Sequence, residues 1–398
     1  MMRTGMTALL MILIMICSTS MTGCWNLHEP EDLAVVLATA FDYDDEKGLF
    51  NVIVQLANPL GSTTNTGEGT TEKHKSFEVL SAYGKTPFEA MQSLGQISCR
   101  MVFWGHNRVI LFSEKMARHG IKEALDVIER RRLTRLTARP AVIRGDIRKL
   151  MEAECPFEET GAEGLEKLIA TVPYEKSVIN TNLFIDLYNT LEEPGKEMFM
   201  GKIKVREEEN CAEEEGSASA EVGGGAIFKG DRMVGWASQQ QTEGWLYALE
   251  RGFIFNINIE CPGSDGEYIA IEISKPKSSM VPTGSGREVG VRLKVNARGS
   301  VEDISCYKNV MDRDFRLAVE RRSAQVIRNR ISDMIRKSQE LESDICGFGY
   351  LIYRKRPDIW KEIGADWDEI FPHLPVDLDV RFKLIRSGLV ENPLKMGR

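Results

Sequence analysis

The sequence is poor in the features that carry a chain across a membrane or support catalysis. Its main apolar stretch, residues 6–17 around the octet 9–16, is short, whereas a membrane-spanning helix needs about 20 residues. No GxSxG nucleophile motif and no phosphate-binding P-loop occurs. The few histidines stand in separate contexts without HExxH spacing, at His28, His74, His106, His119 and His373. We therefore expect no enzymatic activity, no cofactor and no metal.

Basic charge is also in deficit. The chain has 51 Lys and Arg residues against 59 Asp and Glu residues, a formal net charge of −8. A nucleic-acid-binding protein needs a basic surface, so the balance argues against that function. No Lys/Arg cluster flanks the N-terminus, which argues against electrostatic binding to anionic lipid.

The eight cysteines include no CxxC pair and have no nearby histidine partner. Zinc sites usually show closely spaced ligand pairs, so the spacing does not favour a metal site. A chain of this length does not require disulfides for stability, so we expect buried free thiols. This expectation covers Cys99, Cys155, Cys211, Cys261, Cys306 and Cys346, since Cys17 lies in the apolar N-terminal stretch.

The N-terminus has the pattern of an export signal: Arg3, a short apolar stretch, then small residues. Met21-Thr22-Gly23-Cys24 resembles a bacterial lipobox. We predict cleavage of residues 1–23 and attachment of a diacylglycerol to the sulfur and an acyl chain to the amine of Cys24. Each buried methylene contributes about 0.8 kcal/mol, so two or three chains anchor the protein. Trp25 then lies at the membrane surface or packs on the first domain. The alternative to lipid attachment is ordinary signal cleavage beside an unmodified Cys24.

The rest of the chain predicts a mixed α/β (α+β) protein with each sheet flanked by helices. Strand and helix patterns alternate from residue 33 to 152, with Thr86 and Asp146 expected as helix caps. Hairpins are predicted at residues 33–57 and around Gly230. Three alternating runs between 253 and 301 predict an antiparallel meander. A long helix at 308–342 follows, and the strand at 376–388 returns beside the meander, so the last sheet packs on the long helix. The expected domains are residues 24–175, 176–252 and 253–398.

Several local motifs have plain structural interpretations. The stretches 61–72 and 206–220 are expected to be exposed loops, and 284–290 a hairpin loop. The Gly-Phe-Gly at 347–349 indicates close packing or a helix break rather than a phosphate site.

Side chains that invite a functional interpretation also have simpler ones. His106 is expected in a turn, and Asp377 with Asp379 reflects the abundance of acidic residues. We expect three aromatic residues to cover the C-terminal core, or else to form an exposed docking patch; they are Trp360, Trp367 and Phe371.

Three stretches together resemble the Ger(x)C family of spore-germination lipoproteins. They are GCWNLHEPEDLAVVLATAFDYD (23–44), FWGHNRVILFSEKMARHGI (103–121) and the C-terminal block from DICGFGYLIYRKRPDIW to FKLIRSGLV (344–390). The resemblance runs from Cys24 to about residue 390. The loops at 61–72 and 206–220 and the lipobox residue Met21 depart from the family pattern.

The resemblance implies a three-domain α/β protein without enzymatic activity. Such a protein is the C subunit of a nutrient germinant receptor, lipid-anchored on the outer face of the spore inner membrane. Its partners are a multi-spanning A subunit and a transporter-like B subunit, and the latter is the better candidate for binding the germinant. An extracytoplasmic solute-binding lipoprotein is the alternative, although such proteins usually show two similar α/β lobes.

Overall fold

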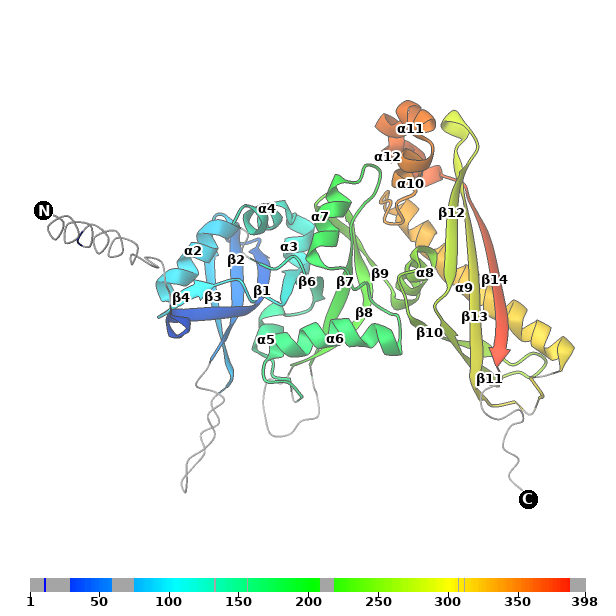
Figure 1. The fold of residues 1–398 in the computed structure, drawn as a ribbon, viewed down its shortest axis with the longest axis horizontal. Helices are drawn as coiled ribbons and strands as arrows, with labels where there is room; N and C mark the ends of the chain where they lie inside the picture. The colour runs from blue at the N-terminus through cyan, green and yellow to red at the C-terminus, as the bar shows by residue number, and fades with distance from the viewer. Residues whose placement is uncertain are drawn as a thin grey trace, which may run out of the picture.

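The computed structural model describes residues 29–58, 75–131, 134–155, 157–207, 218–306, 308–310 and 312–386, together with Met11. Apart from Met11, the predicted signal peptide lies outside the described residues, as do Cys24, Trp25, the loop 61–72 and residues 208–217 of the second loop. Two sheets lie at opposite ends of an elongated body (Figure 1). The structure is therefore a mixed α/β protein, as predicted. The division into three domains stays a prediction.

The first sheet has nine strands in the order β3-β2-β1-β5-β6-β7-β8-β9, with β4 paired to β1. Its centre is parallel, because β1, β5, β6 and β7 run in one direction. The strands are β1 (Leu33–Asp44), β2 (Leu49–Ala57), β3 (Phe77–Gly84), β4 (Met101–Phe103), β5 (Val109–Ser113), β6 (Arg139–Arg144), β7 (Phe199–Glu207), β8 (Ala218–Lys229) and β9 (Arg232–Ala237).

Helices and buried clusters cover both faces of this sheet. All five residues of β5 are buried, as expected for a parallel strand covered on both sides. A short 3-10 turn, η1 (Pro30–Asp32), precedes β1. The helices are α2 (Pro87–Ile97), α3 (Glu114–His119), α4 (Lys122–Arg131), α5 (Ile147–Glu152), α6 (Gly161–Glu175) and α7 (Phe184–Glu192).

Local signals in the sequence correctly predicted several element ends. The Thr86 side chain accepts a hydrogen bond from the Glu89 amide and caps α2, and Asp146 caps α5 in the same way. The β1–β2 and β8–β9 pairs are antiparallel hairpins, and Gly230 in the second turn has φ +60°. These turns were predicted because their residue types favour few other conformations.

The second sheet has the order β10-β11-β13-β12, with β14 parallel to β13. Its strands are β10 (Ile254–Glu260), β11 (Tyr268–Ser274), β12 (Lys277–Thr283), β13 (Gly290–Ile304) and β14 (Val376–Arg386), with the 3-10 turn η2 (Gly286–Glu288) between β12 and β13. One side of the long strand β13 pairs with β12 and β11, and β14 lies along its other side.

The meander prediction was wrong in one respect. The strand β12 was missed, and it separates β11 from β13 in the chain. No residue of β12 is buried, and Pro282 within it cannot donate a ladder hydrogen bond. The segment therefore has no alternating apolar pattern that sequence analysis could detect. The hairpin loop predicted at 284–290 is confirmed, because it connects β12 to β13.

The long helix α9 (Arg313–Glu340) covers the free edge of β14, as predicted for a strand that returns under it. Glu320 accepts a hydrogen bond from the Leu384 amide at 3.0 Å, and Arg328 donates to the Leu378 carbonyl at 2.5 Å. Side chains of α9 thus satisfy backbone groups that an edge strand leaves unpaired. Asp312 caps the helix, which begins five residues later than expected.

The helix α8 (Gln239–Leu249) connects the two sheets. Its buried Trp245 and Tyr247 belong to a core that includes Phe199 of the first sheet and Phe255 of the second. A Cβ on Gly244 would lie 2.2 Å from the Arg330 carbonyl oxygen, so α8 and α9 pack closely at this glycine. The two bodies are therefore joined by a continuous apolar core.

The remaining helical turns follow α9 and cover one end of the second sheet (Figure 1). They are α10 (Phe348–Lys355), α11 (Pro357–Ile363), η3 (Gly364–Asp366), α12 (Trp367–Ile370) and η4 (Phe371–His373).

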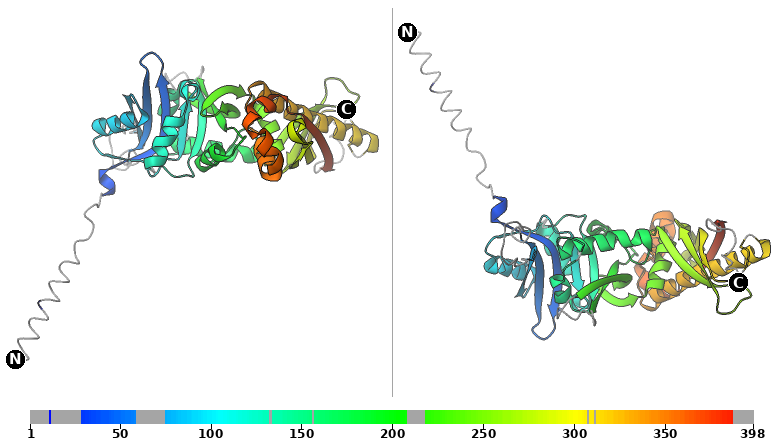
Figure 2. Two further views of the ribbon diagram at one scale, coloured as in Figure 1. Left: turned by 90° about the horizontal axis from the view of Figure 1, so that it is seen from above. Right: turned by 90° about the horizontal axis from the view of Figure 1, so that it is seen from below.

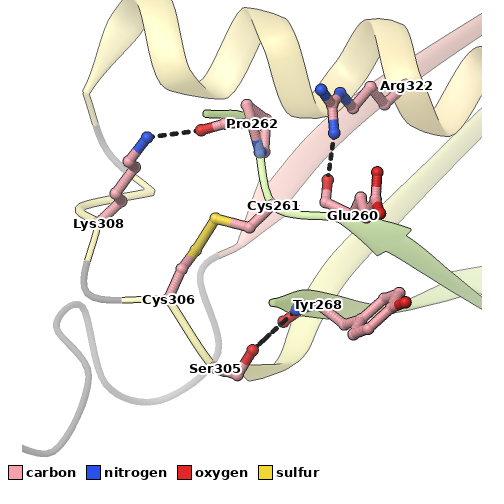
Figure 3. The surroundings of a disulfide bond; sticks show 8 residues. All are labelled: Glu260, Cys261, Pro262, Tyr268, Ser305, Cys306, Lys308 and Arg322. Carbon is pink, nitrogen blue, oxygen red and sulfur yellow. Dashed lines mark hydrogen bonds between the residues drawn. A yellow bond between two sulfur atoms is a disulfide. The ribbon is translucent and has the colours of Figure 1, made fainter. Parts of the chain in front are cut away.

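The prediction of free thiols was wrong for two cysteines. Cys261 and Cys306 form a disulfide between the end of β10 and the segment after β13 (Figure 3). The two cysteines are 45 residues apart in the chain, but β11 pairs with both β10 and β13 and brings their ends together. Sequence spacing could not show this proximity. The free thiols among the described residues are Cys99, Cys155 and Cys346. Cys346 is buried as predicted, whereas the prediction of burial was wrong for the exposed Cys99 and the half-buried Cys155. Cys211 lies outside the described residues.

Candidate functional site

Residues 193–198, which lead into β7, pack closely against residues 342–350, which follow α9. We call this contact the junction. The Glu197 amide donates to the Asp344 carbonyl at 3.0 Å, and the Tyr350 amide donates to the Gly195 carbonyl at 3.2 Å. The Ser343 hydroxyl donates to the Phe228 carbonyl of β8. These hydrogen bonds therefore hold the second sheet and its helices against the first sheet and its helices. We call each sheet with its helices a sheet unit.

Asp344 is the buried polar centre of the junction and is only 2% exposed. Its carboxylate accepts hydrogen bonds from the Phe348 amide at 3.0 Å and the Gly349 amide at 2.8 Å, so it caps the start of α10. Burial raises the pKa of Asp344 to about 7, although these amides favour the charged form. Burial also raises the pKa of Glu197, which accepts from the Gly230 amide.

The Gly-Phe-Gly at 347–349 forms a helix break with close packing, as predicted. Gly347 has φ +71°, a conformation that side chains rarely adopt. A Cβ on Gly349 would lie 2.6 Å from both the Gly195 carbonyl oxygen and the Trp367 indole nitrogen. Both glycines serve the packing of the junction.

Aromatic residues surround the junction and cover the C-terminal core, which confirms that prediction. Trp367 and Phe371 are 5% and 2% exposed, and the Trp360 ring centroid lies 5.6 Å from that of Trp367. From the other side, the Trp245 indole donates to the Ile345 carbonyl at 2.9 Å. These rings exclude water from Asp344, which explains the direction of its pKa shift.

The histidines do not converge on one site. His28 and His74 lie outside the described residues. His106 lies in the turn before β5, as expected, 5.7 Å from the Phe103 ring. His119 stacks on Tyr43 at 3.6 Å, and His373 is exposed in η4.

Other candidate groups have structural partners. Asp377 pairs with Arg292 at 2.7 Å and Asp379 with Arg381 at 3.1 Å, so both carboxylates serve strand-surface ion pairs. Burial raises the pKa of the Cys346 thiol, which disfavours the reactive thiolate.

One group of possible metal ligands occurs among the described residues: Cys261, Glu267 and Cys306. Its two sulfur atoms are joined to each other, so neither is available as a thiolate ligand. Among the helices described, none has both the length and the apolar composition to cross a membrane.

Sequence analysis missed the disulfide and the junction contacts. No spacing or composition signal marks Glu197 or Gly195 as partners of residues near 344, since about 150 residues of intervening chain separate them. The one sequence feature that pointed to this region was the resemblance of the block from residue 344 onward to the Ger(x)C family. The lipid attachment residue Cys24 lies outside the described residues, so its modification stays a prediction.

Two family models match the chain in succession. Residues 26–205 match the spore germination protein N-terminal domain, and residues 223–388 match the C-terminal domain of spore germination B3/GerAC-like proteins. The first match ends within β7 and the second begins within β8. Together the two matches cover nearly all of the described structure.

Full-length relatives are similar throughout. Spore germination protein KC of Bacillus subtilis is 24% identical, with 99% of this chain and 98% of that protein covered. Spore germination protein GerQC of Bacillus cereus is 22% identical, with 96% and 99% covered. The crystal structure of the GerBC protein superposes with a TM-score of 0.56 at 16% identity, covering 87% of this chain and 97% of that one. The chain belongs to the GerAC/GerKC-like family of spore germination proteins, as a homologue of their C subunits.

Proposed function

We propose that this protein is the lipid-anchored C subunit of a nutrient germinant receptor. In this role it assembles with the membrane-embedded A and B subunits and has no catalytic activity of its own. The observation that carries the proposal is similarity over the whole body to spore germination proteins. The predicted three-domain organisation, with boundaries near residues 175 and 252, forms part of this proposal.

The predicted anchor suits the arrangement of the body. β1 begins nine residues after Cys24, and nine residues span at most about 30 Å. A lipid on Cys24 therefore holds the first sheet close to the membrane surface. β1 begins at the end of the body opposite the second sheet (Figure 2). We infer that the first sheet lies nearer the outer face of the spore inner membrane than the second.

The disulfide supports an exported location. Disulfides persist in oxidising compartments and are rare in the cytosol, and Cys261–Cys306 joins two buried cysteines. An export signal at residues 1–23 would bring the chain to such a compartment.

The alternative of a solute-binding lipoprotein receives less support. Its two lobes usually resemble each other, whereas the two sheets here differ in strand number and direction. Titration of amino acids and sugars into the purified chain, followed by calorimetry, distinguishes the two hypotheses.

The anchor is tested by replacing Cys24 with Ala in spores. The variant is expected to leave the membrane fraction and to impair germination, because no other strong attachment is predicted. Cys17→Ala, within the signal, is the matched control and is expected to retain membrane association. Full membrane retention and normal germination of Cys24→Ala spores contradict the anchor's role.

A further inference from the structure

A cavity of about 400 Å³ opens beside the junction, between the two sheet units. Its inner wall is apolar and at most 5% exposed, and it consists of Phe199, Trp245, Ile345 and Cys346. Its rim carries four basic residues, namely Lys196, Arg251, Arg354 and Lys355. We call this cavity the basic pocket.

The charge of the basic pocket is opposite to that of the whole chain. Glu197 is its one acidic lining residue, against four cations, whereas the whole chain has a formal charge of −8. The Glu197 carboxylate already accepts a hydrogen bond from the Gly230 amide at 2.7 Å. The rim therefore produces a local positive potential that attracts anions.

Three of the four cations have no carboxylate partner among the residues that the structure describes. The Arg251 guanidinium donates a hydrogen bond to the neutral Asn182 amide oxygen and lies 5.6 Å from the Trp245 ring centroid. The Arg354 guanidinium lies 5.8 Å from the Tyr350 ring centroid. The Lys355 ammonium donates to the Met280 carbonyl at 3.0 Å. Lys196 differs, because it pairs with Glu193.

The neighbouring residue Arg356 differs from Arg354 and Lys355 in having a carboxylate partner. It forms a 2.9 Å ion pair with Asp358 and does not line the basic pocket. Within the basic stretch 354–356, the two residues that line the pocket therefore lack a carboxylate partner, and the one that does not line it has one.

We propose that the basic pocket binds a small organic anion that carries an aromatic or branched aliphatic group on a carboxylate. The apolar group lies against Trp245 and Phe199, where its burial is favourable. The carboxylate accepts hydrogen bonds from Arg251 and Arg354 at the rim, since guanidinium groups match carboxylate geometry. A bare anion leaves the apolar wall unused, and a neutral apolar molecule leaves the cations unpaired.

Such a ligand contacts both sheet units. Phe199 begins β7 of the first sheet, whereas Ile345 and Arg354 belong to the segment that follows α9. Binding therefore stabilises the arrangement of the junction by an amount that depends on ligand concentration. This inference goes beyond the proposed receptor role and stands independently of it.

The test is calorimetric titration of three matched probes into the chain from residue 24 onward, with Cys24→Ser, which contains every described helix and strand. The probes are phenylacetate, the neutral 2-phenylethanol and the cationic 2-phenylethylamine, with inorganic phosphate as a bare anion. Phenylacetate is expected to bind saturably and at least tenfold more tightly than the other three.

Variants locate the binding site. Arg354→Gln is expected to weaken phenylacetate binding about fivefold, the upper end for an exposed charge pair, and Arg251→Gln/Arg354→Gln more strongly. Arg356→Gln is the matched control and leaves the affinity unchanged. Circular dichroism establishes that each variant is folded.

Any of three results overturns the proposal. The first is the absence of saturable phenylacetate binding to the folded chain. The second is affinity for phosphate, 2-phenylethanol or 2-phenylethylamine equal to that for phenylacetate. The third is equal affinity of Arg354→Gln, Arg251→Gln/Arg354→Gln and the unmodified chain for phenylacetate. None of these results bears on membrane anchoring or subunit assembly, which are measured separately.

Discussion

Removing the Cys261–Cys306 disulfide should destabilise the second sheet substantially. The bond closes a loop of 45 residues that contains β11, β12 and β13. In the chain-entropy model, closing a loop of this length restricts the unfolded chain by about 4 kcal/mol at 25 °C. Both cysteines are buried, so replacement by Ala retains an apolar side chain at each position. We therefore expect Cys261→Ala/Cys306→Ala to lower the free energy of unfolding by about 4 kcal/mol.

Urea unfolding, followed by tryptophan fluorescence with and without reductant, measures this effect. The unmodified chain is expected to lose stability when reductant is added, whereas the double variant is insensitive to it. Cys346→Ala is the matched control, because Cys346 is buried but unpaired; it keeps the sensitivity to reductant. Equal stability of the unmodified chain with and without reductant would refute the reasoning, as would failure to detect the linked peptides by non-reducing mass spectrometry.

Three further predictions concern the junction and the helix pair α8–α9. Gly349→Ala should cost about 1–3 kcal/mol by overpacking, because its Cβ would lie 2.6 Å from the Gly195 carbonyl oxygen; thermal unfolding measures this. Its control Gly95→Ala, where a Cβ meets open space, should be neutral or stabilising. Burial raises the pKa of Asp344 from 3.8 to about 7, so the folded state keeps a proton that the unfolded state loses. The contribution of Asp344 to the free energy of unfolding therefore falls as the pH rises between about 4 and 7, and it stays constant above about pH 7. Between pH 5 and 8 the unmodified chain should lose about 3 kcal/mol more than Asp344→Asn, and equal slopes in chemical denaturation contradict this. Glu243→Ala should cost about 3 kcal/mol, since it removes the buried carboxylate that pairs with the Arg330 guanidinium, whose side chain is 14% exposed; a free energy of unfolding unchanged within about 1 kcal/mol contradicts this.

Local rules predicted most elements of the fold correctly. Thr86 and Asp146 cap helices where expected, and Gly230 turns a hairpin, because each residue type has a strong intrinsic preference at such positions. The strand β12 was missed because it has no buried face, so the apolar alternation that marks other strands is absent.

Long-range contacts could not be predicted from local pattern. The pairing of Cys261 with Cys306 depends on the order of strands in the second sheet. This order could not be predicted, because β12 itself was not predicted. The junction likewise joins Glu197 to Asp344 across the chain. Only the similarity of the C-terminal block indicated that residues near 344 are constrained.

The basic pocket shows the same limitation. Arg251 and Arg354 come from different parts of the sequence, and neither belongs to a motif. The net charge of the whole chain is negative, and this sum cannot reveal a small site where positive side chains gather. The three-dimensional arrangement was needed to bring these cations to one cavity.

Co-purification from spore inner membranes tests the central claim most directly. The full chain, tagged at its C-terminus and expressed in the sporulating cell, is extracted in mild detergent and its partners are identified by mass spectrometry. The account predicts that a multi-spanning A subunit and a transporter-like B subunit co-purify, and that Cys24→Ala lowers their yield. Recovery of the chain from the inner membrane without either subunit, under conditions in which a known receptor remains intact, would contradict the account.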